Sequence, residues 1–341
     1  MYSIPDWARA FGTPAVVAEI RTEPSDFVVE EQIAIECSGY GEHDWLRIEK
    51  TGANTHWVAG RLAQHAGIPE RDVGYAGLKD RHAVTRQWFS VRRVGETDWT
   101  AFSAEGVSVL ECRRHRRKLQ RGAHVGNRFR IALRGTGIAA AAGLLEERLE
   151  EIGVAGVPNY FGEQRFGRDG GNVSLALALF AGKRLARHKR SMALSAARSL
   201  LFNAVLDTRV RDSSWNRILP GELVNLDGTG SVFAVDAPDA ELERRCSEQD
   251  IHPTATLWGA GAPLSSGRVA EIEKAVTGDW TDIIRGLEAA GLNPLTRPLR
   301  LPVRGLAWAF ESDALWVEFT LDSGAFATAV LRELARIVDG H

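Results

Sequence analysis

Residues 74–90 read GYAGLKDRHAVTRQWFS, and this stretch decides where the chain turns and where a strand begins. Gly74 and Gly77 lie close together in it, which favours a tight backbone turn. The run Gln87–Arg92 that follows mixes large apolar and polar side chains, as a strand does. We therefore expect Asp80 to lie in a loop that leads into a strand, where a rigid sheet can hold it.

Asp80 is flanked in sequence by two cations, Lys79 and Arg81. Opposite charge nearby favours the ionised form of an acid, and an ionised, well-positioned Asp can act as a nucleophile. A charged surface turn can show the same three residues, so the triplet alone leaves both interpretations open.

Four further segments, in order along the chain, accompany this stretch: PSDFVVEE at 24–31, HRRKLQRGAHVGNRF at 115–129, NYFGEQRFG at 159–167 and SGAFATAVLRE at 323–333. Together with GLKDRHAVTRQ they resemble the TruD family of pseudouridine synthases. The resemblance spans nearly the whole chain, and several collinear motifs make it specific. In that family the Asp of the Lys-Asp pair is the catalytic nucleophile, which corresponds to Asp80.

The resemblance implies an isomerase that converts a uridine of transfer RNA, at position 13 in bacterial members, to pseudouridine. Phe27, Asn127, Phe129 and Phe326 match family positions that contact the target nucleotide. A Phe supplies a stacking face and an Asn amide can bind a uracil edge, although each Phe can equally be a core residue. Lys79 is expected to orient the nucleophile or to contact a phosphate.

The basic residues are unevenly distributed. The chain has 341 residues and a formal net charge of only −2, yet residues 113–121 hold six Lys or Arg and no acid, and residues 183–190 hold five. Such blocks can neutralise phosphates even when the total charge is near zero, or they can be solvated faces. With the resemblance, we expect RNA contacts from Arg116, Arg117, Lys118, Arg121 and Arg165.

Two histidines lie near these motifs. Histidine titrates near neutral pH, which makes His82 a candidate general base for removal of the C5 proton. The family resemblance does not supply that role. His124 is expected to be structural or to face a phosphate.

Several classes of protein and site are disfavoured. Cys37, Cys112 and Cys246 are isolated, which argues against a disulfide framework and a zinc site and fits a reducing cytoplasm. The sequence has no long apolar run and no signal-peptide core. Residues 162–171 are rich in glycine but lack the ending of a nucleotide-binding loop. We expect no cofactor, no metal and no membrane, and a monomer in the cytoplasm whose partner is tRNA.

The predicted fold class is α+β. Strand patterns occur at both ends of the chain and helical patterns in the middle, which suggests an inserted domain. We expect a discontinuous catalytic pseudouridine synthase domain at 1–155 and 299–341, with a mixed, mainly antiparallel sheet and flanking helices. An inserted helix-rich α/β domain of the TruD type is expected at 156–298, and a hairpin over 303–321 with a closing helix at 325–338 should complete the catalytic sheet and bring Phe326 beside Asp80.

Two other functions are compatible with the residues alone. One is a non-catalytic RNA-binding or RNA-folding protein, against which the complete motif around Asp80 argues. The other is a glycosidase that releases the base, because a carboxylate at an anomeric carbon is also glycosidase chemistry.

Overall fold

A computed structural model of the protein describes residues 2–261 and 263–339. By its internal contacts the chain forms two compact units, each assembled from separate stretches of sequence. Unit 1 comprises residues 1–14, 147–302 and 325–334, and unit 2 comprises residues 15–146, 303–324 and 335–341.

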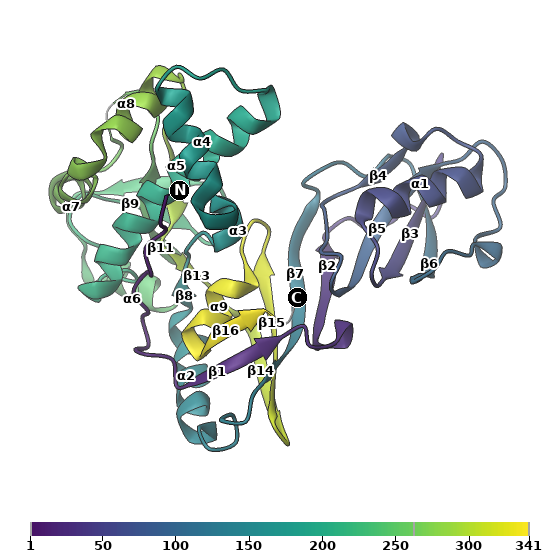
Figure 1. Ribbon diagram of the computed structural model, residues 1–341, viewed down its shortest axis with the longest axis horizontal. Helices are drawn as coiled ribbons and strands as arrows, with labels where there is room; N and C mark the ends of the chain where they lie inside the picture. The colour runs from purple at the N-terminus through teal and green to yellow at the C-terminus, as the bar shows by residue number, and fades with distance from the viewer. Residues whose placement is uncertain (1, 262, 340–341) are drawn as a thin grey trace. The chain divides into compact units, whose positions relative to one another are not determined.

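Unit 2 is built on a mixed sheet of ten strands within the described residues (Figure 1). Its main path runs β14-β15-β7-β2-β5-β3-β6, with β1, β4 and β16 paired to the side. Most pairs are antiparallel, and β2–β5 and β1–β16 are parallel. The strands are β1 (Val16–Ile20), β2 (Phe27–Ile33), β3 (His43–Lys50), β4 (Val73–Tyr75), β5 (Val84–Arg92), β6 (Val107–His115), β7 (His124–Arg134), β14 (Arg304–Glu311), β15 (Ala314–Asp322) and β16 (Ala335–Asp339).

The hairpin β14–β15 joins the sheet through β7, as the sequence predicts. The register places Phe319 opposite Phe129, and Leu321 opposite Asn127. Strands from the two ends of the chain therefore share one sheet, on which several of the predicted site residues lie.

One helix, α1 (Thr55–Ala66), lies over β4 and β5 and closes a core of its own (Figure 1). Its buried face presents Val58 and Leu62 to Leu46 and Phe89 of the sheet. Gly67 ends the helix in the left-handed conformation, with φ 66°, which glycine adopts without strain. The helix thus places its N-terminal Thr55 beside the loop that carries Asp80.

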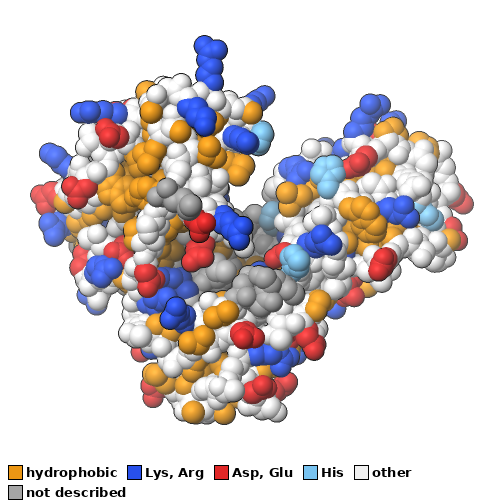
Figure 2. All heavy atoms as spheres, viewed as in Figure 1, with side chains coloured by type: hydrophobic (Ala, Val, Ile, Leu, Met, Phe, Trp, Pro, Cys, Tyr) orange, Lys and Arg blue, Asp and Glu red, His pale blue; other side chains and the backbone are white. Residues whose placement is uncertain are grey.

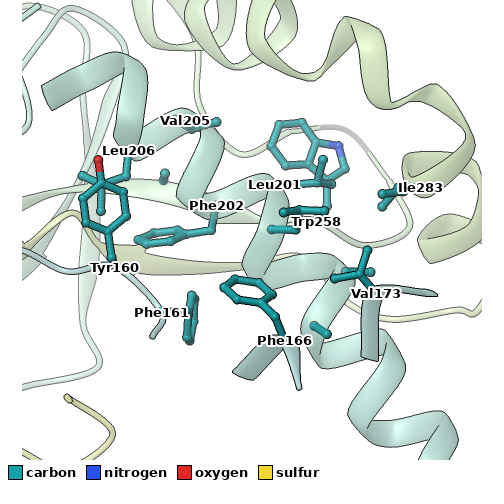
Figure 3. Packing of buried hydrophobic residues seen from close by; sticks show 14 of the residues in the cluster. Tyr160, Phe161, Phe166, Val173, Leu201, Phe202, Val205, Leu206, Trp258 and Ile283 are labelled. Carbon is teal, nitrogen blue, oxygen red and sulfur yellow. The ribbon is translucent and has the colours of Figure 1, made fainter. Parts of the chain in front are cut away.

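Unit 1 is an α/β structure around the long helix α5 (Arg187–Arg211). Figure 3 shows side chains of α5, including Phe202 and Val205, packed against the aromatic rings of Tyr160 and Trp258. The other helices are α2 (Ala142–Ala155), which crosses the sequence boundary between the units, α3 (Glu163–Phe166), α4 (Gly171–Phe180), α6 (Ala240–Ser247), α7 (Gly267–Thr277), α8 (Thr281–Ala289) and α9 (Ala327–Leu334). Among residues 2–261 and 263–339, none of the helices has the length and apolar character of a membrane span.

The middle of the chain, for which the sequence shows mainly helical patterns, also contains strands. A four-stranded sheet has the order β10-β9-β11-β12, and a separate pair joins β8 to β13. These strands are short, and their mixed polar and apolar residues give little alternation to detect. They are β8 (Val157–Pro158), β9 (Glu222–Leu226), β10 (Val232–Val235), β11 (Ile251–Leu257), β12 (Leu295–Pro298) and β13 (Arg300–Leu301).

The predicted closing helix is correct only in its first part. It ends at Leu334, and the next residues form β16, which runs parallel to β1. Ile337 and Val338 are β-branched and favour a strand, and β1 offers an unpaired edge to them. The helix and the strand also fall in different units, since residues 325–334 belong to unit 1 and the following residues belong to unit 2.

Candidate active site

The carboxylate of Asp80 is held on both of its oxygens. Oδ2 lies 3.1 Å from Nη2 of Arg21, and Oδ1 accepts the backbone N–H of His82 at 3.1 Å. The side chain is still 37% exposed. It is therefore oriented by the protein and accessible to a substrate, which are both requirements of a nucleophile.

Arg21, the partner of Asp80, was not among the predicted site residues. It directly follows β1, is buried, and has a φ of 59°, a left-handed conformation that is uncommon for a residue with a side chain. Its guanidinium lies 4.2 Å from the centre of the Phe27 ring. An unusual backbone conformation at an ion pair with a candidate nucleophile is the kind of local strain that accumulates at functional sites.

The two cations next to Asp80 in sequence contact other groups in the structure. Arg81 donates from Nε to the carbonyl of Gly52 at 2.9 Å. Lys79 faces Glu31 across an ion pair of 3.1 Å. Adjacent side chains on an extended backbone point in different directions, so the counter-ion of Asp80 comes from elsewhere in the chain.

Lys79 joins two strands of the sheet. Glu31 of β2 and Asn127 of β7 are direct neighbours across the strands. Lys79 Nζ lies 3.1 Å from Glu31 Oε2 and donates to Asn127 Oδ1 at 2.5 Å. The Lys79 side chain is only 7% exposed, which does not suit contact with a phosphate in solution. Because Lys79 occupies the carbonyl of the Asn127 side chain, the amide nitrogen of Asn127 is the group left to donate to a ligand.

Lys50, also absent from the predictions, fixes the backbone at Asp80. It lies at the end of β3, is completely buried, and donates from Nζ to the Asp80 carbonyl at 2.7 Å. Burial lowers the pKa of Lys50 to about 8, an effect that the charge of Asp80 opposes and that of Lys79 reinforces.

The loop before Asp80 is anchored to α1 and β5. Thr55 Oγ1 accepts the backbone N–H of Lys79 at 3.0 Å and donates to Gln87 Oε1 at 3.0 Å. Gln87 Nε2 in turn donates to the Gly77 carbonyl at 3.2 Å. The loop is therefore held just before Asp80 and leads into β5, as the prediction of a loop leading into a strand requires.

Phe27 and Phe129 lie beside this loop but are mostly covered. Phe27 is 4% and Phe129 is 7% exposed, and their rings meet edge to face with centres 6.4 Å apart. Phe129 also packs on Phe319, with ring centres 5.4 Å apart. Since Arg21 lies against the ring of Phe27, these rings present little free face for a base.

Phe326 packs against the core of unit 1, half-buried beside the α5 cluster. It belongs to unit 1 and Asp80 to unit 2. The expectation that both lie in one domain is not reproduced by this division, because the chain leaves the sheet of unit 2 after β15 and re-enters it only at β16.

The basic block 113–121 begins at the end of β6 and continues into the loop that follows. Arg116, Arg117 and Arg121 are exposed and Lys118 is half-buried. None of these four takes part in an ion pair within the described residues, and Arg121 lies 4.0 Å from the centre of the Tyr75 ring. Figure 2 shows acidic and basic side chains interspersed over the drawn face.

His82 and His124 differ in their exposure and in their contacts. The backbone of His82 binds Asp80, and its side chain is exposed. Burial, followed by the charge of Lys79, lowers the pKa of His124, which lies 2.9 Å from Ser323 Oγ. The lowered pKa favours the neutral imidazole, which fits a structural role better than a phosphate contact. Among the described residues, no group of three or more His, Cys, Asp or Glu side chains is arranged to hold a metal ion.

Comparison with known proteins places this site in a family. A family model described as tRNA pseudouridine synthase D (TruD) matches residues 8–179 and 176–334. A tRNA pseudouridine synthase D of Methylococcus capsulatus is 48% identical over 334 residues, covering 96% of this chain and 94% of its own length. One of Aeromonas salmonicida is 47% identical over 326 residues, covering 95% and 92%.

The fold is also found in a solved structure. The crystal structure described as a putative tRNA pseudouridine synthase D from Methanosarcina mazei superposes with a TM-score of 0.79 at 20% identity, covering 98% of this chain and 96% of that one. With a family model matching most of its length and relatives at 47 and 48% identity, this chain belongs to the TruD family of pseudouridine synthases.

Proposed function

We propose that this protein is a tRNA pseudouridine synthase that isomerises the uridine at position 13, with Asp80 as the nucleophile. The observation that carries the proposal is the Asp80 carboxylate, which is held on both oxygens yet remains open to a ligand. It occurs in the family motif of a chain that belongs to this family.

The reaction breaks the N1–C1′ bond of uridine and joins C1′ to C5. The C5 proton leaves and N1 gains one, so no atom or electron is lost overall. Asp80 supplies the nucleophile, and its ion pair with Arg21 keeps a negative charge oriented in the loop. Because a base stacked in an RNA helix cannot reach this carboxylate, the target nucleotide has to be flipped out first.

Asn127 is the substrate-contacting residue that the geometry favours most. Lys79, itself paired with Glu31, donates to the side-chain carbonyl of Asn127, which leaves the Asn127 amide nitrogen to donate to a uracil carbonyl. Phe27 and Phe129 then act as the apolar floor beneath the base rather than as free stacking faces. Lys79 acts by positioning, and Phe326 is proposed to contribute an apolar contact to the bound nucleotide.

The exposed cations Arg116, Arg117 and Arg121 and the half-buried Lys118, none of which is in an ion pair within the described residues, are proposed to contact the tRNA backbone, together with Arg165. Their charges are not neutralised by acids within the described residues, so phosphates can take that place. Unit 2, which contains Asp80, is proposed as the catalytic domain and unit 1 as the second, family-specific domain. The enzyme is proposed to work as a monomer in the cytoplasm, without a metal or cofactor.

The test is incubation of the purified protein with unmodified tRNA transcripts, followed by mapping of pseudouridine at single-nucleotide resolution. We expect one modified position, number 13, and no product in a transcript with cytidine at that position. Tight binding without any pseudouridine would instead indicate the non-catalytic RNA-binding protein. Modification only at other positions would retain the reaction and correct the target.

A further inference from the structure

We propose that Arg165 and Arg297 form a binding site for a backbone phosphate of the tRNA, built around the ring of Phe161 in unit 1. The inference rests on the proposed function, in that the ligand is the RNA on which the enzyme acts. It adds Arg297 and Phe161 to the RNA-binding residues and gives Arg165 a defined partner.

Phe161 is a fixed platform for the two arginines. Asn203 on α5 holds its backbone on both sides, accepting its N–H at 2.9 Å and donating to its carbonyl at 3.0 Å. Its ring packs on Phe202 with centres 5.4 Å apart. Figure 3 shows Phe161 among the labelled rings of Tyr160, Phe166 and Phe202.

Both guanidinium groups lie at this ring. The Cζ of Arg297 is 4.1 Å and that of Arg165 is 5.1 Å from the centre of the Phe161 ring. Arg297 comes from β12 and Arg165 from α3, so two distant parts of the sequence converge here. Such cation–π contacts orient a guanidinium while leaving its N–H groups able to bind an anion.

Each arginine is positioned by one neutral oxygen. Arg297 Nη2 donates to Asn159 Oδ1 at 2.5 Å, and Arg165 Nη1 donates to Ser195 Oγ at 2.8 Å. Within the described residues, neither is paired with a carboxylate, and the Nε atoms of both are buried without a hydrogen-bond partner. Both residues are of intermediate exposure, between the buried core and the open surface of unit 1.

Another buried arginine of the same unit shows what a purely structural arrangement looks like. Arg209 is buried against the carboxylate of Glu222, 2.9 Å away, and it donates further hydrogen bonds to the Ser214 and Arg217 carbonyls. Its charge is compensated inside the protein. Arg165 and Arg297 have no carboxylate partner among the described residues, so a ligand can supply the compensating negative charge.

The pKa shifts of the two arginines also favour an anionic ligand. Burial lowers the pKa of Arg165, and burial together with the charge of Arg165 lowers the pKa of Arg297 to about 10. Both groups remain charged at neutral pH and repel each other. Guanidinium groups bind phosphate oxygens through paired N–H donors, so a phosphodiester bound at the terminal nitrogens of the two arginines relieves the repulsion.

The test is the salt dependence of tRNA binding, measured with the full-length protein and an unmodified transcript for the wild type, Arg165→Gln, Arg297→Gln and the double variant. If each arginine contributes to neutralising a phosphate, each single substitution lowers the slope of log K against log salt by about one unit. Arg165→Lys and Arg297→Lys, which keep the charge, should retain more of the slope.

Arg244→Gln is the matched control, because it removes one arginine charge from the same unit at an exposed position paired with Glu241 and Glu248. It should leave the slope unchanged. A purely structural role for Arg165 and Arg297 predicts lower thermal stability with an unchanged slope, which would overturn the proposal. Stabilisation of the wild type by inorganic phosphate without any effect of the substitutions on tRNA binding would also overturn it, in favour of a site for free anions.

Failure of this inference and failure of the proposed function are distinguishable. Binding is measured without turnover, whereas pseudouridine mapping reports the reaction. Slopes that fall in the variants while the wild type makes no pseudouridine support the phosphate site and reject the reaction. Unchanged slopes alongside normal modification of the tRNA reject the phosphate site alone.

Discussion

Arg21 and Lys79, in the site around Asp80, each face a carboxylate, whereas Arg165 and Arg297, around Phe161, face only neutral oxygens. In the first region each of these two cations has a carboxylate partner within the protein, so the network can hold the Asp80 carboxylate in a fixed orientation. Around Phe161 the two arginines have no carboxylate partner among the described residues, so the proposed site needs an anion from outside the protein to balance their charge. The comparison separates the region proposed to react from the region proposed to bind.

Asp80→Asn should have the largest effect on the reaction. It keeps the size and much of the hydrogen bonding of the side chain but removes the nucleophile, so single-turnover product formation should fall by about 10³-fold or more. Affinity for tRNA should remain within a few-fold of the wild type, since the binding cations are untouched. A variant that retains a substantial single-turnover rate would assign the nucleophile to another residue.

Replacing the spatial partner of Asp80 should matter more than replacing its sequence neighbour. Arg21→Gln removes the cation that contacts Oδ2, and we expect kcat to fall by about 10²-fold, as when one preorganised donor to a reacting charge is removed. Arg81→Gln, whose guanidinium contacts the Gly52 carbonyl, serves as the control and should stay within a few-fold. Equal losses in the two variants would mean that general positive charge, rather than the observed ion pair, supports Asp80.

The basic block should act on binding alone. Arg116→Gln combined with Arg117→Gln should weaken tRNA affinity and lower the salt slope by about one unit for each phosphate that the protein no longer neutralises. The kcat at saturating tRNA should be unchanged. Fluorescence anisotropy over a range of salt concentrations measures the slope, and an unaltered slope would identify the block as a solvated face.

The smallest predicted effect is a pH dependence of stability from Lys50. Its pKa is about 8 in the folded protein against 10.5 as the reference, so between these values the unfolded chain binds more protons. Stability relative to Lys50→Met should therefore rise with pH across this window and be flat below it. Urea unfolding of both proteins at pH 7, 8, 9 and 10 provides the measurement, and a difference that does not change with pH contradicts the burial of a charged lysine.

The sequence predicted the local parts of this structure well. The strand-like run Gln87–Arg92 lies in β5, and the hairpin expected over 303–321 forms β14 and β15. Asp80 was identifiable because its motif is contiguous and specific to a family. The tRNA pseudouridine synthase assignment and the α+β class were confirmed for the same reason, since the motifs recur in order along the chain.

The partners that act through space could not be predicted. Nothing near Arg21 or Lys50 in sequence indicates that they meet Asp80, because those contacts depend on how β1 and β3 are placed against the loop. The same holds for Arg297, which reaches Phe161 only through β12. Lys79 and Arg81 flank Asp80 in sequence, which suggested that they are its counter-ions. In the structure their side chains point in other directions, and they contact Glu31 and the Gly52 carbonyl instead.

The measurement that tests the central claim most directly uses tRNA whose uridines carry tritium at C5, incubated with the wild-type protein under single-turnover conditions. Isomerisation expels the C5 hydrogen while the base stays attached. We predict one equivalent of tritium in water per tRNA and no free uracil. Tritium recovered in free uracil would show a base-releasing glycosidase, and tritium retained entirely in the RNA would show a protein that only binds; either result would contradict the account.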